Sequence, residues 1–135
     1  MNMFWSIIER NKWYSCQLLT DDDDIVCKCR VAASPEVLNI DCWYTDKKYQ
    51  GQGYGGKALH KLLHYIVNEI GVPAKVQYTW NGANEYVYDW MCKHFDARCT
   101  CPLAVQKECA DDDWESHIYV LDRDKFIDYF HLRRE

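Results

Sequence analysis

The sequence predicts a mixed α+β fold, and three observations support this prediction. The first third of the chain carries four segments with strand patterns, separated by turns. A glycine-rich stretch follows the fourth segment, and an amphipathic helix pattern begins directly after it. Beyond that helix come a strand pattern, a second helix pattern and further strand patterns. A length of 135 residues with 48% hydrophobic content suits one core, so we assign residues 1–135 to a single domain.

The first four expected strands have clear boundaries, because turn residues separate them. Alternation in the fourth strand predicts a core face with Leu38, Ile40, Cys42 and Tyr44, and an opposite face with Val37, Asn39, Asp41 and Trp43. The four expected strands are Phe4–Glu9, Trp13–Leu19, Ile25–Val31 and Val37–Thr45.

The glycine-rich stretch is the strongest functional signal in the chain. Glycine tolerates positive φ and lets a ligand approach the backbone closely. An apolar stripe runs from Ala58 to Ile70, and Gly71 stands where a helix C-cap is expected. A glycine loop that opens a helix presents unpaired N–H groups to an anion, so the sequence predicts a phosphate-binding loop. Its glycines are Gly51, Gly53, Gly55 and Gly56.

The segment from Tyr49 to Leu59 resembles the pyrophosphate loop of the GNAT superfamily of N-acetyltransferases, whose pattern is Arg/Gln-x-x-Gly-x-Gly/Ala. In this chain Gln50, Gly53 and Gly55 carry that pattern. The resemblance implies a central, mostly antiparallel, twisted sheet of about six or seven strands, with the loop helix and a second helix packed on it. It also implies acetyl-CoA as co-substrate, with its pyrophosphate on the loop. The expected loop contacts are Gln50, Gly51, Gln52, Gly53, Tyr54, Gly55, Gly56 and Lys57.

The resemblance assigns further roles around the loop. By position, Trp43, Tyr44 and Thr45 end the strand that contacts acetyl-CoA, and Asp41 on that strand is the expected general base, although it can equally be a solvated strand carboxylate. Asn39 occupies another position where some members carry an acid.

A second matching segment begins at Asn81, after the expected strand Ala74–Trp80. The segment resembles the family's Asn-x-x-Ala-x-x-Leu-Tyr pattern, which implies that Asn81 binds the pantetheine arm and that Tyr88 protonates the leaving thiolate. In another register Trp90 takes the place of the tyrosine, and an indole has no acid proton to give.

The C-terminal part predicts two strands, Ala97–Leu103 and His117–Leu121, and a short helix capped by Asp122 or Asp124. This helix is an addition to the minimal family fold. The chain also departs from the family before Gln50, where no amphipathic helix is found between the first strands. Either the two usual acceptor-site helices or the first strand is therefore missing. We expect the acceptor site to be open, or closed by a partner subunit such as a second copy of the chain.

Composition narrows the classes of partner. The charge balance of 16 basic and 21 acidic residues disfavours nucleic-acid binding. No apolar run approaches membrane-spanning length, and the first residues lack the pattern of a signal peptide, so we expect a cytoplasmic protein without membrane partners. The eight cysteines show no familiar zinc spacing, which favours buried free thiols and no metal site.

Three functional hypotheses follow. The first is an N-acetyltransferase that moves acetyl from acetyl-CoA to a primary amine of a small molecule or protein. The second is a weak or inactive CoA-binding module. The third is a dinucleotide-binding protein, because Gly51, Gly53 and Gly56 also satisfy G-x-G-x-x-G. That third site requires an acid about twenty residues past the loop, and none stands there.

Overall fold

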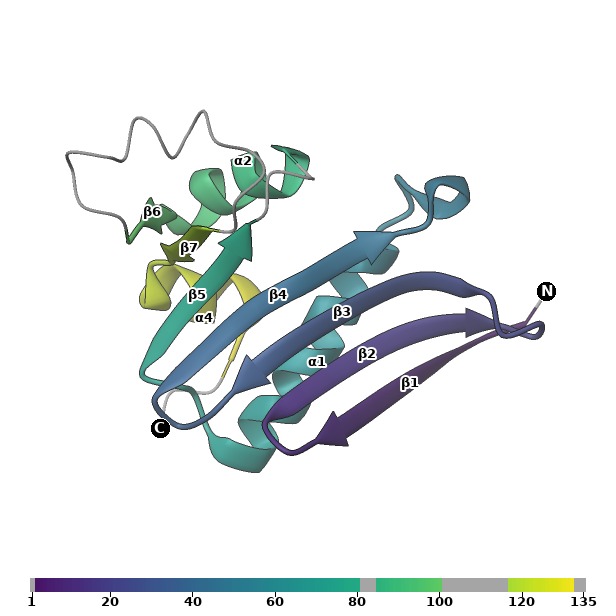
Figure 1. The fold of residues 1–135 in the computed structure, drawn as a ribbon, viewed down its shortest axis with the longest axis horizontal. Coiled ribbons are helices and arrows are strands. Elements are labelled where there is room, and N and C mark those ends of the chain that lie inside the picture. The colour runs from purple at the N-terminus through teal and green to yellow at the C-terminus, as the bar shows by residue number, and fades with distance from the viewer. Residues whose placement is uncertain (1, 81–84, 101–116, 133–135) are drawn as a thin grey trace.

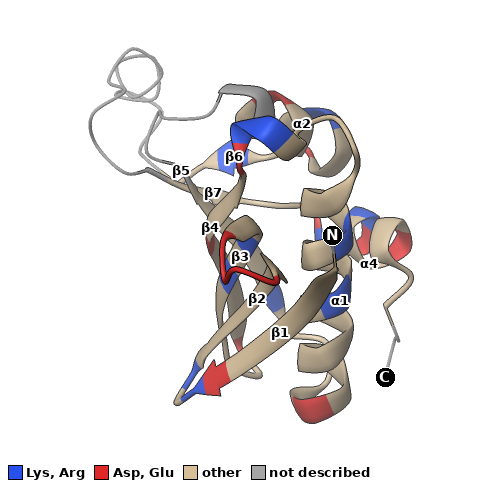
Figure 2. Ribbon diagram, turned by 90° about the vertical axis from the view of Figure 1, so that its right-hand side faces the viewer, with Lys and Arg blue, Asp and Glu red and all other residues tan. Residues whose placement is uncertain are grey.

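The structure, a computed structural model, describes residues 2–80, 85–100 and 117–132. These residues form one seven-stranded sheet with three α-helices, all on one side of it (Figures 1 and 2). The predicted mixed α+β class is therefore confirmed. The strands are β1 (Met3–Arg10), β2 (Trp13–Thr20), β3 (Ile25–Ala33), β4 (Val37–Thr45), β5 (Lys75–Trp80), β6 (Arg98–Cys99) and β7 (His117–Val120). The helices are α1 (Tyr54–Ile70), α2 (Glu85–Phe95) and α4 (Arg123–Phe130), with a 3₁₀ turn η1 (Lys47–Tyr49).

The strand order is β1-β2-β3-β4-β5-β7-β6, and every pair is antiparallel except β4 with β5. The parallel pair is joined by α1, because a parallel connection needs a crossover segment. β1 and β2 are joined only by Asn11 and Lys12, with Asn11 at φ 57°. The first strand is therefore present, at the edge of the sheet. Of the two alternatives that the sequence left open, the absence of the acceptor-site helices is the one observed within residues 2–53.

Helix α1 forms because its apolar residues recur every three or four positions and face the sheet. It packs on β2, β3 and β4. Gly71 ends it as predicted, at φ 81°, with its N–H donating to the carbonyl of Val67. Its fully buried residues are Ala58, Leu59, Leu62, Leu63 and Ile66.

Strand β4 contains a β-bulge at Asp41. Ile40 pairs with Val31 of β3 and Cys42 pairs with Arg30, which leaves Asp41 as the extra residue. An extra residue reverses which side chains point to which face. The bulge therefore divides β4 into two halves of opposite alternation.

The prediction of a continuous core face along β4 is wrong beyond this bulge. Trp43 pairs with the buried Cys29 and faces α1, whereas Tyr44 is 43% exposed on the opposite face. The predicted alternation holds for Leu38 and Ile40, which are both buried.

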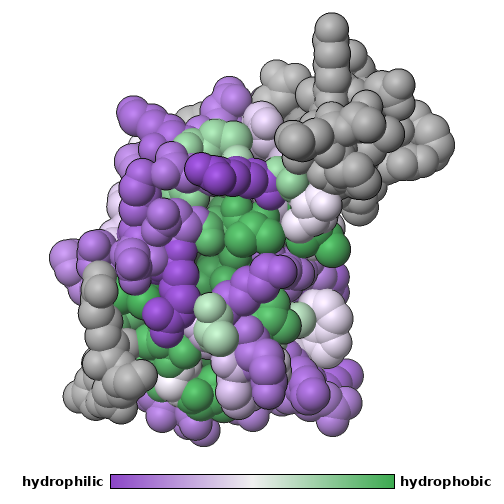
Figure 3. Space-filling model, turned by 90° about the vertical axis from the view of Figure 1, so that its left-hand side faces the viewer, coloured by the Kyte–Doolittle hydropathy of each residue, from purple (hydrophilic) through white to green (hydrophobic). Residues whose placement is uncertain are grey.

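At the C-terminal end, Asp122 caps α4 by accepting from the backbone N–H of Lys125 at 3.0 Å. Phe126, Ile127 and Phe130 are buried, as predicted. The predicted strand over 97–103 is shorter in the described residues, where β6 covers Arg98–Cys99, and its residues 101–103 lie outside them. Seen from the side of β7 and α4, apolar residues gather in the middle and polar ones surround them (Figure 3).

Candidate cofactor cleft

The candidate site lies where β4 and β5 part. The two strands pair only over Val37–Ile40 and Lys75–Tyr78, although β4 continues along β3 to Thr45. The bulge at Asp41 marks the point of divergence. Beyond it, the side of β4 that faced β5 has no strand partner among the described residues, so its backbone groups remain available for a ligand.

The glycine loop lies beside the free end of β4. Gly51 and Gly53 have φ values of 83° and 81°, the left-handed region that a side chain rarely adopts. Gly53 is the N-cap of α1 and makes no side-chain capping bond. The side-chain amide of Gln50 donates to the carbonyl of Thr45 at 3.1 Å, which ties the loop to the strand. The result is a helix N-terminus whose first N–H groups face the cleft uncapped.

The two remaining glycines of the loop are needed for different reasons. A Cβ built on Gly55 lies 3.0 Å from Thr45 Oγ1 and 3.3 Å from Trp43 Nε1, so this position is closely packed against β4. A Cβ built on Gly56 has no atom within 4 Å. The space above Gly56 is open, and a side chain there would project into it.

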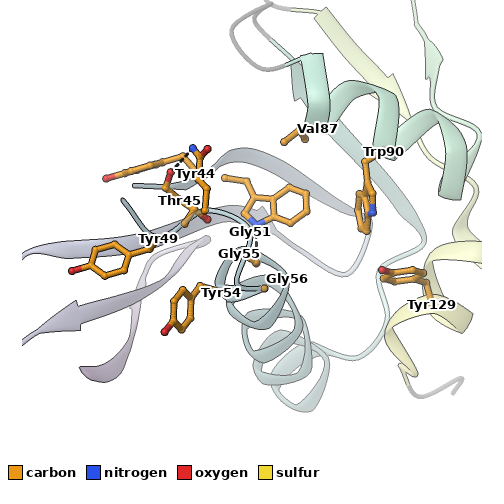
Figure 4. Close-up of a pocket in the computed structure, with 13 residues that line it drawn as sticks. Tyr44, Thr45, Tyr49, Gly51, Tyr54, Gly55, Gly56, Val87, Trp90 and Tyr129 are labelled. Carbon is orange, nitrogen blue, oxygen red and sulfur yellow. Dashed lines mark hydrogen bonds between the residues drawn. The ribbon is translucent and has the colours of Figure 1, made fainter. Parts of the chain in front are cut away.

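Trp43 forms the floor of the cleft. Its indole Nε1–H donates to the carbonyl of Gly55 at 2.8 Å, and its ring meets that of Trp90 edge-on at 5.3 Å. The cleft has a volume of about 660 Å³. Figure 4 shows Tyr44 and Tyr49 on one side of the loop and Trp90 and Tyr129 on the other.

Most of the predicted cofactor-binding residues line this cleft, whereas Gln52 and Lys57 are exposed beside it. Asn81 lies outside the described residues. The predicted residues that line the cleft are Trp43, Tyr44, Thr45, Gln50, Gly51, Gly53, Tyr54, Gly55 and Gly56.

Asp41 lies at the bulge, on the edge of the diverging strands, but it is already paired. Its Oδ1 accepts from Arg30 Nε and its Oδ2 from Arg30 Nη2, both at 3.1 Å. These two bonds raise the pKa of Arg30 above its usual value. The neighbouring polar contact on this face joins Thr79 Oγ1 to Asn39 Oδ1 at 3.0 Å.

Tyr88 does not line the cleft. Its ring meets that of Tyr119 at 5.3 Å, and burial, followed by a hydrogen bond with Cys92, raises its pKa. Val87 and Trp90 are the α2 residues on the cleft side. In the alternative register of the family pattern, Trp90 takes the place of the tyrosine, and Trp90 is the residue that lines the cleft.

The sequence did not point to Tyr49, Val87 or Tyr129 as cleft residues. Tyr49 immediately precedes the loop, so its place in the sequence could have predicted that it lines the cleft. Tyr129 is separated from the loop by more than seventy positions and is brought there by α4 alone. No local pattern distinguishes it from the other aromatic residues of that helix.

No group of three or more metal-ligating side chains occurs among residues 2–80, 85–100 and 117–132. Cys16, Cys27 and Cys29 are buried free thiols. No helix in the described part of the chain has the length and apolarity needed to cross a membrane.

Comparison with known proteins agrees with this geometry. The model of the acetyltransferase (GNAT) family matches residues 3–89, which include the whole of the diverging strands and the glycine loop. No curated protein sequence matches the chain.

Several solved structures share the fold. A GNAT family acetyltransferase from Elizabethkingia anophelis, with acetyl-CoA bound, aligns over 90% of this chain and 98% of its own, at 12% identity and a TM-score of 0.55. An acetyltransferase of the GNAT family from Staphylococcus aureus aligns over 82% of this chain and 68% of its own, at 11% identity and a TM-score of 0.59. Nourseothricin acetyltransferase aligns over 82% of this chain and 64% of its own, at 15% identity and a TM-score of 0.55. At these identities the structures establish the fold, and the match to the family model establishes that this chain belongs to the GNAT acetyltransferase family.

Proposed function

We propose that the protein is an acetyl-CoA-dependent N-acetyltransferase that acetylates a primary amine of a small molecule or a protein. The observation that carries the proposal is the uncapped N-terminus of α1, which opens on a cleft between two diverging strands. Backbone N–H groups at a helix N-terminus favour a phosphate group.

The residues present fit acetyl-CoA. Gly51 and Gly53 have the backbone conformation that turns the loop, and the open space above Gly56 leaves room for a pyrophosphate. The Elizabethkingia protein of the same fold is known with acetyl-CoA bound, which supports the choice of this ligand. When bound, acetyl-CoA supplies an activated acetyl thioester.

The chain's own groups then position the two substrates. In this proposal the backbone of β4 from Trp43 to Thr45, which does not pair with β5, binds the pantetheine arm, although the Thr45 carbonyl already accepts from Gln50. Backbone N–H groups of the same segment stabilise the oxyanion that forms when the amine attacks. Asn81 as a further pantetheine contact remains a prediction. Much of the rate acceleration in such a site comes from holding the reactants together.

Asp41 is the proposed proton acceptor for the attacking amine. An amine with a pKa near 10.4 is mostly protonated at neutral pH, so a base has to remove a proton. Because both oxygens of Asp41 bind Arg30, the carboxylate has to exchange this partner or act through a water molecule. Arg30 has a side chain that is 47% exposed, so solvent can reach the pair.

Tyr88 as the acid for the leaving thiolate also remains a prediction, and its position makes the role demanding. The ring has to leave Tyr119 to enter the cleft, and a raised pKa makes the phenol a weaker acid. If Tyr88 is the acid, Tyr88→Phe lowers kcat about tenfold or more with cofactor affinity unchanged. A smaller decrease assigns the proton to solvent in this open cleft.

The second candidate is a CoA-binding module with little turnover. Two observations favour low turnover: both oxygens of Asp41 are bonded to Arg30, and Tyr88 is not among the residues that line the cleft. The parallel unit β4-α1-β5 is the feature shared with dinucleotide-binding folds, but its neighbours in the sheet are antiparallel.

One experiment separates these functions. Purified protein is titrated calorimetrically with acetyl-CoA, CoA and NAD(P), and thiol release is then followed with a panel of amines. Micromolar binding of acetyl-CoA together with amine-dependent thiol release supports the transferase. Binding without turnover supports the module, and binding of NAD(P) alone overturns both.

A further inference from the structure

The face of the sheet that no described helix covers carries a row of three interacting side chains (Figure 2). Trp13 of β2, Arg30 of β3 and Asp41 of β4 lie on neighbouring strands. The Arg30 guanidinium lies over the Trp13 ring, 5.1 Å from its centroid, and its Nε and Nη2 both donate to the Asp41 carboxylate at 3.1 Å. An aromatic ring and a carboxylate therefore fix the position of the guanidinium from two sides.

Arg30 still has donors to offer to a further ligand. Its side chain is 47% exposed, whereas that of Asp41 is 17% exposed. A guanidinium carries five N–H donors in a planar fork, and the two bonds to Asp41 use only Nε and Nη2. In the described part of the chain, no group accepts a hydrogen bond from Nη1. The free edge of the fork thus faces solvent in a geometry that suits a carboxylate.

The charges around this row also favour an anion. Three cations and one acid share the open face on strands β1 to β4, which the structure describes in full. They are Arg10, Lys28, Arg30 and Asp41. The chain as a whole has a net charge of −5, so the excess of cations is a local property of this face.

The row lies beside the cofactor cleft. Asp41 is the bulge residue at which β4 leaves β5, and Tyr44, on the same open face, lines the cleft. Asp41 is the proposed proton acceptor, and its bonds to Arg30 place its carboxylate on the open face. The attacking amine therefore has to approach Asp41 from this face.

We propose that Arg30 binds the acceptor, and that the acceptor is an α-amino acid whose carboxylate bonds to the guanidinium while its ammonium group bonds to Asp41. The inference rests on the proposed function. An α-amino acid carries its two opposite charges on one carbon, so it is complementary to an adjacent Arg–Asp ion pair. Its carboxylate replaces Asp41 on Arg30, which releases Asp41 to take the proton of the ammonium group. An amine without a carboxylate offers Arg30 no such replacement.

The test compares each natural α-amino acid that has a primary amine with the matched amine that lacks the carboxylate. In thiol-release assays at saturating acetyl-CoA, we expect at least one amino acid to be acetylated, with a KM about tenfold or more below that of its matched amine. Acetylation of the carboxylate-free amines alone overturns the inference.

The residue is tested with Arg30→Gln. We expect this variant to raise the KM for the amino acid about tenfold or more, without raising the KM for the matched amine and without lowering kcat. Lys28→Gln, two positions away on the same face of β3, is the matched control and retains the preference for the amino acid. A preference that survives Arg30→Gln, or one that Lys28→Gln removes, overturns the inference.

Trp13 is tested as a positioning residue for the guanidinium. We expect Trp13→Ala to raise the KM for the amino acid about two- to fivefold and Trp13→Phe to restore it, because the interaction needs the face of an aromatic ring. The KM for the matched amine stays unchanged in both variants. An equal rise for the two substrates, or no rise in a protein that melts like the unmodified one, overturns this role.

These outcomes also separate the inference from the function. If the protein binds no acetyl-CoA, or binds it and acetylates no amine of either kind, the transferase proposal fails and this inference fails with it. If the protein acetylates amino acids and their matched amines with equal KM, the inference alone fails and the proposed function stands.

Discussion

The two faces of the sheet differ in how completely they are built. The face toward α1 carries a buried core and, at the divergence of β4 and β5, a formed cleft. The other face has no described helix on it (Figure 2), and Ile8, Trp13 and Tyr44 are exposed there. The chain thus has the α1 side of the family fold, whereas within residues 2–53 it lacks the two helices that the family resemblance implies for the acceptor side. The cofactor side can therefore be tested residue by residue, whereas the acceptor has to be found by screening.

The largest expected effect is on stability, and it compares a buried residue on the α1 face of the sheet with an exposed residue on the other face. Ile40 is fully buried on the α1 side and Ile8 is 47% exposed on the other. We expect Ile40→Ala to lower the free energy of unfolding by about 2–5 kcal/mol, because it leaves a cavity. Ile8→Ala, the matched control, changes it by less than about 0.5 kcal/mol. Urea denaturation measures both, and equal losses would show that a partner covers the open face in solution.

The second prediction separates folding from binding within the glycine loop. Gly56→Val leaves the fold intact, since nothing lies within 4 Å of its Cβ, but it lowers acetyl-CoA affinity about 100-fold by filling the phosphate space. Gly55→Val drives its side chain against Thr45 and Trp43 and destabilises the protein by about 1–3 kcal/mol. Thermal melting and calorimetry are run on both. Full affinity in a well-folded Gly56→Val protein removes the loop from the cofactor site.

The third prediction addresses the acceptor side of β4. Once a substrate amine is identified, Asp41→Asn should lower kcat about 100-fold while acetyl-CoA affinity stays the same, because the amide cannot accept a proton. Arg30→Gln is the companion variant: it frees the carboxylate and should not lower kcat. Turnover that is insensitive to Asp41→Asn assigns the carboxylate a structural role in pairing with Arg30.

The smallest expected effect is on cysteine reactivity. It compares the buried cysteines on the α1 face of the sheet with a cysteine on the other face. Burial raises the pKa of Cys16 to about 11, and it also raises the pKa of Cys27 and Cys29. At pH 8 these thiols are almost entirely protonated and covered, so iodoacetamide should leave them unmodified in the folded protein. The partly exposed Cys42 should react, as shown by peptide mass mapping. Rapid labelling of Cys29 would mean that α1 opens from the sheet.

The sequence predicted those features that depend on residues close together in the chain. The first five strands, helix α1, its cap at Gly71 and the glycine-rich turn before it are specified by local spacing, and the structure confirms them. The resemblance in that same stretch identified the family, which the match over residues 3–89 confirms.

The sequence failed where two distant segments had to meet. Alternation alone put Tyr44 in the core, because a bulge depends on how β3 pairs with β4. It also gave no means of choosing between Tyr88 and Trp90, since the rotation of α2 is set by its packing on α4 and β7.

By itself, then, the sequence determined the class of fold, the glycine-rich loop before α1 and the family, because each depends on patterns within continuous segments of the chain. Only the tertiary structure decided that Trp43 forms the floor of the cleft and that Arg30 forms an ion pair with Asp41. It also decided that Tyr129 of α4 lies near the start of α1. The physical reason is that these contacts join residues many positions apart. Their side chains come into contact only when the strands have paired in their native register and the helices have packed against the sheet.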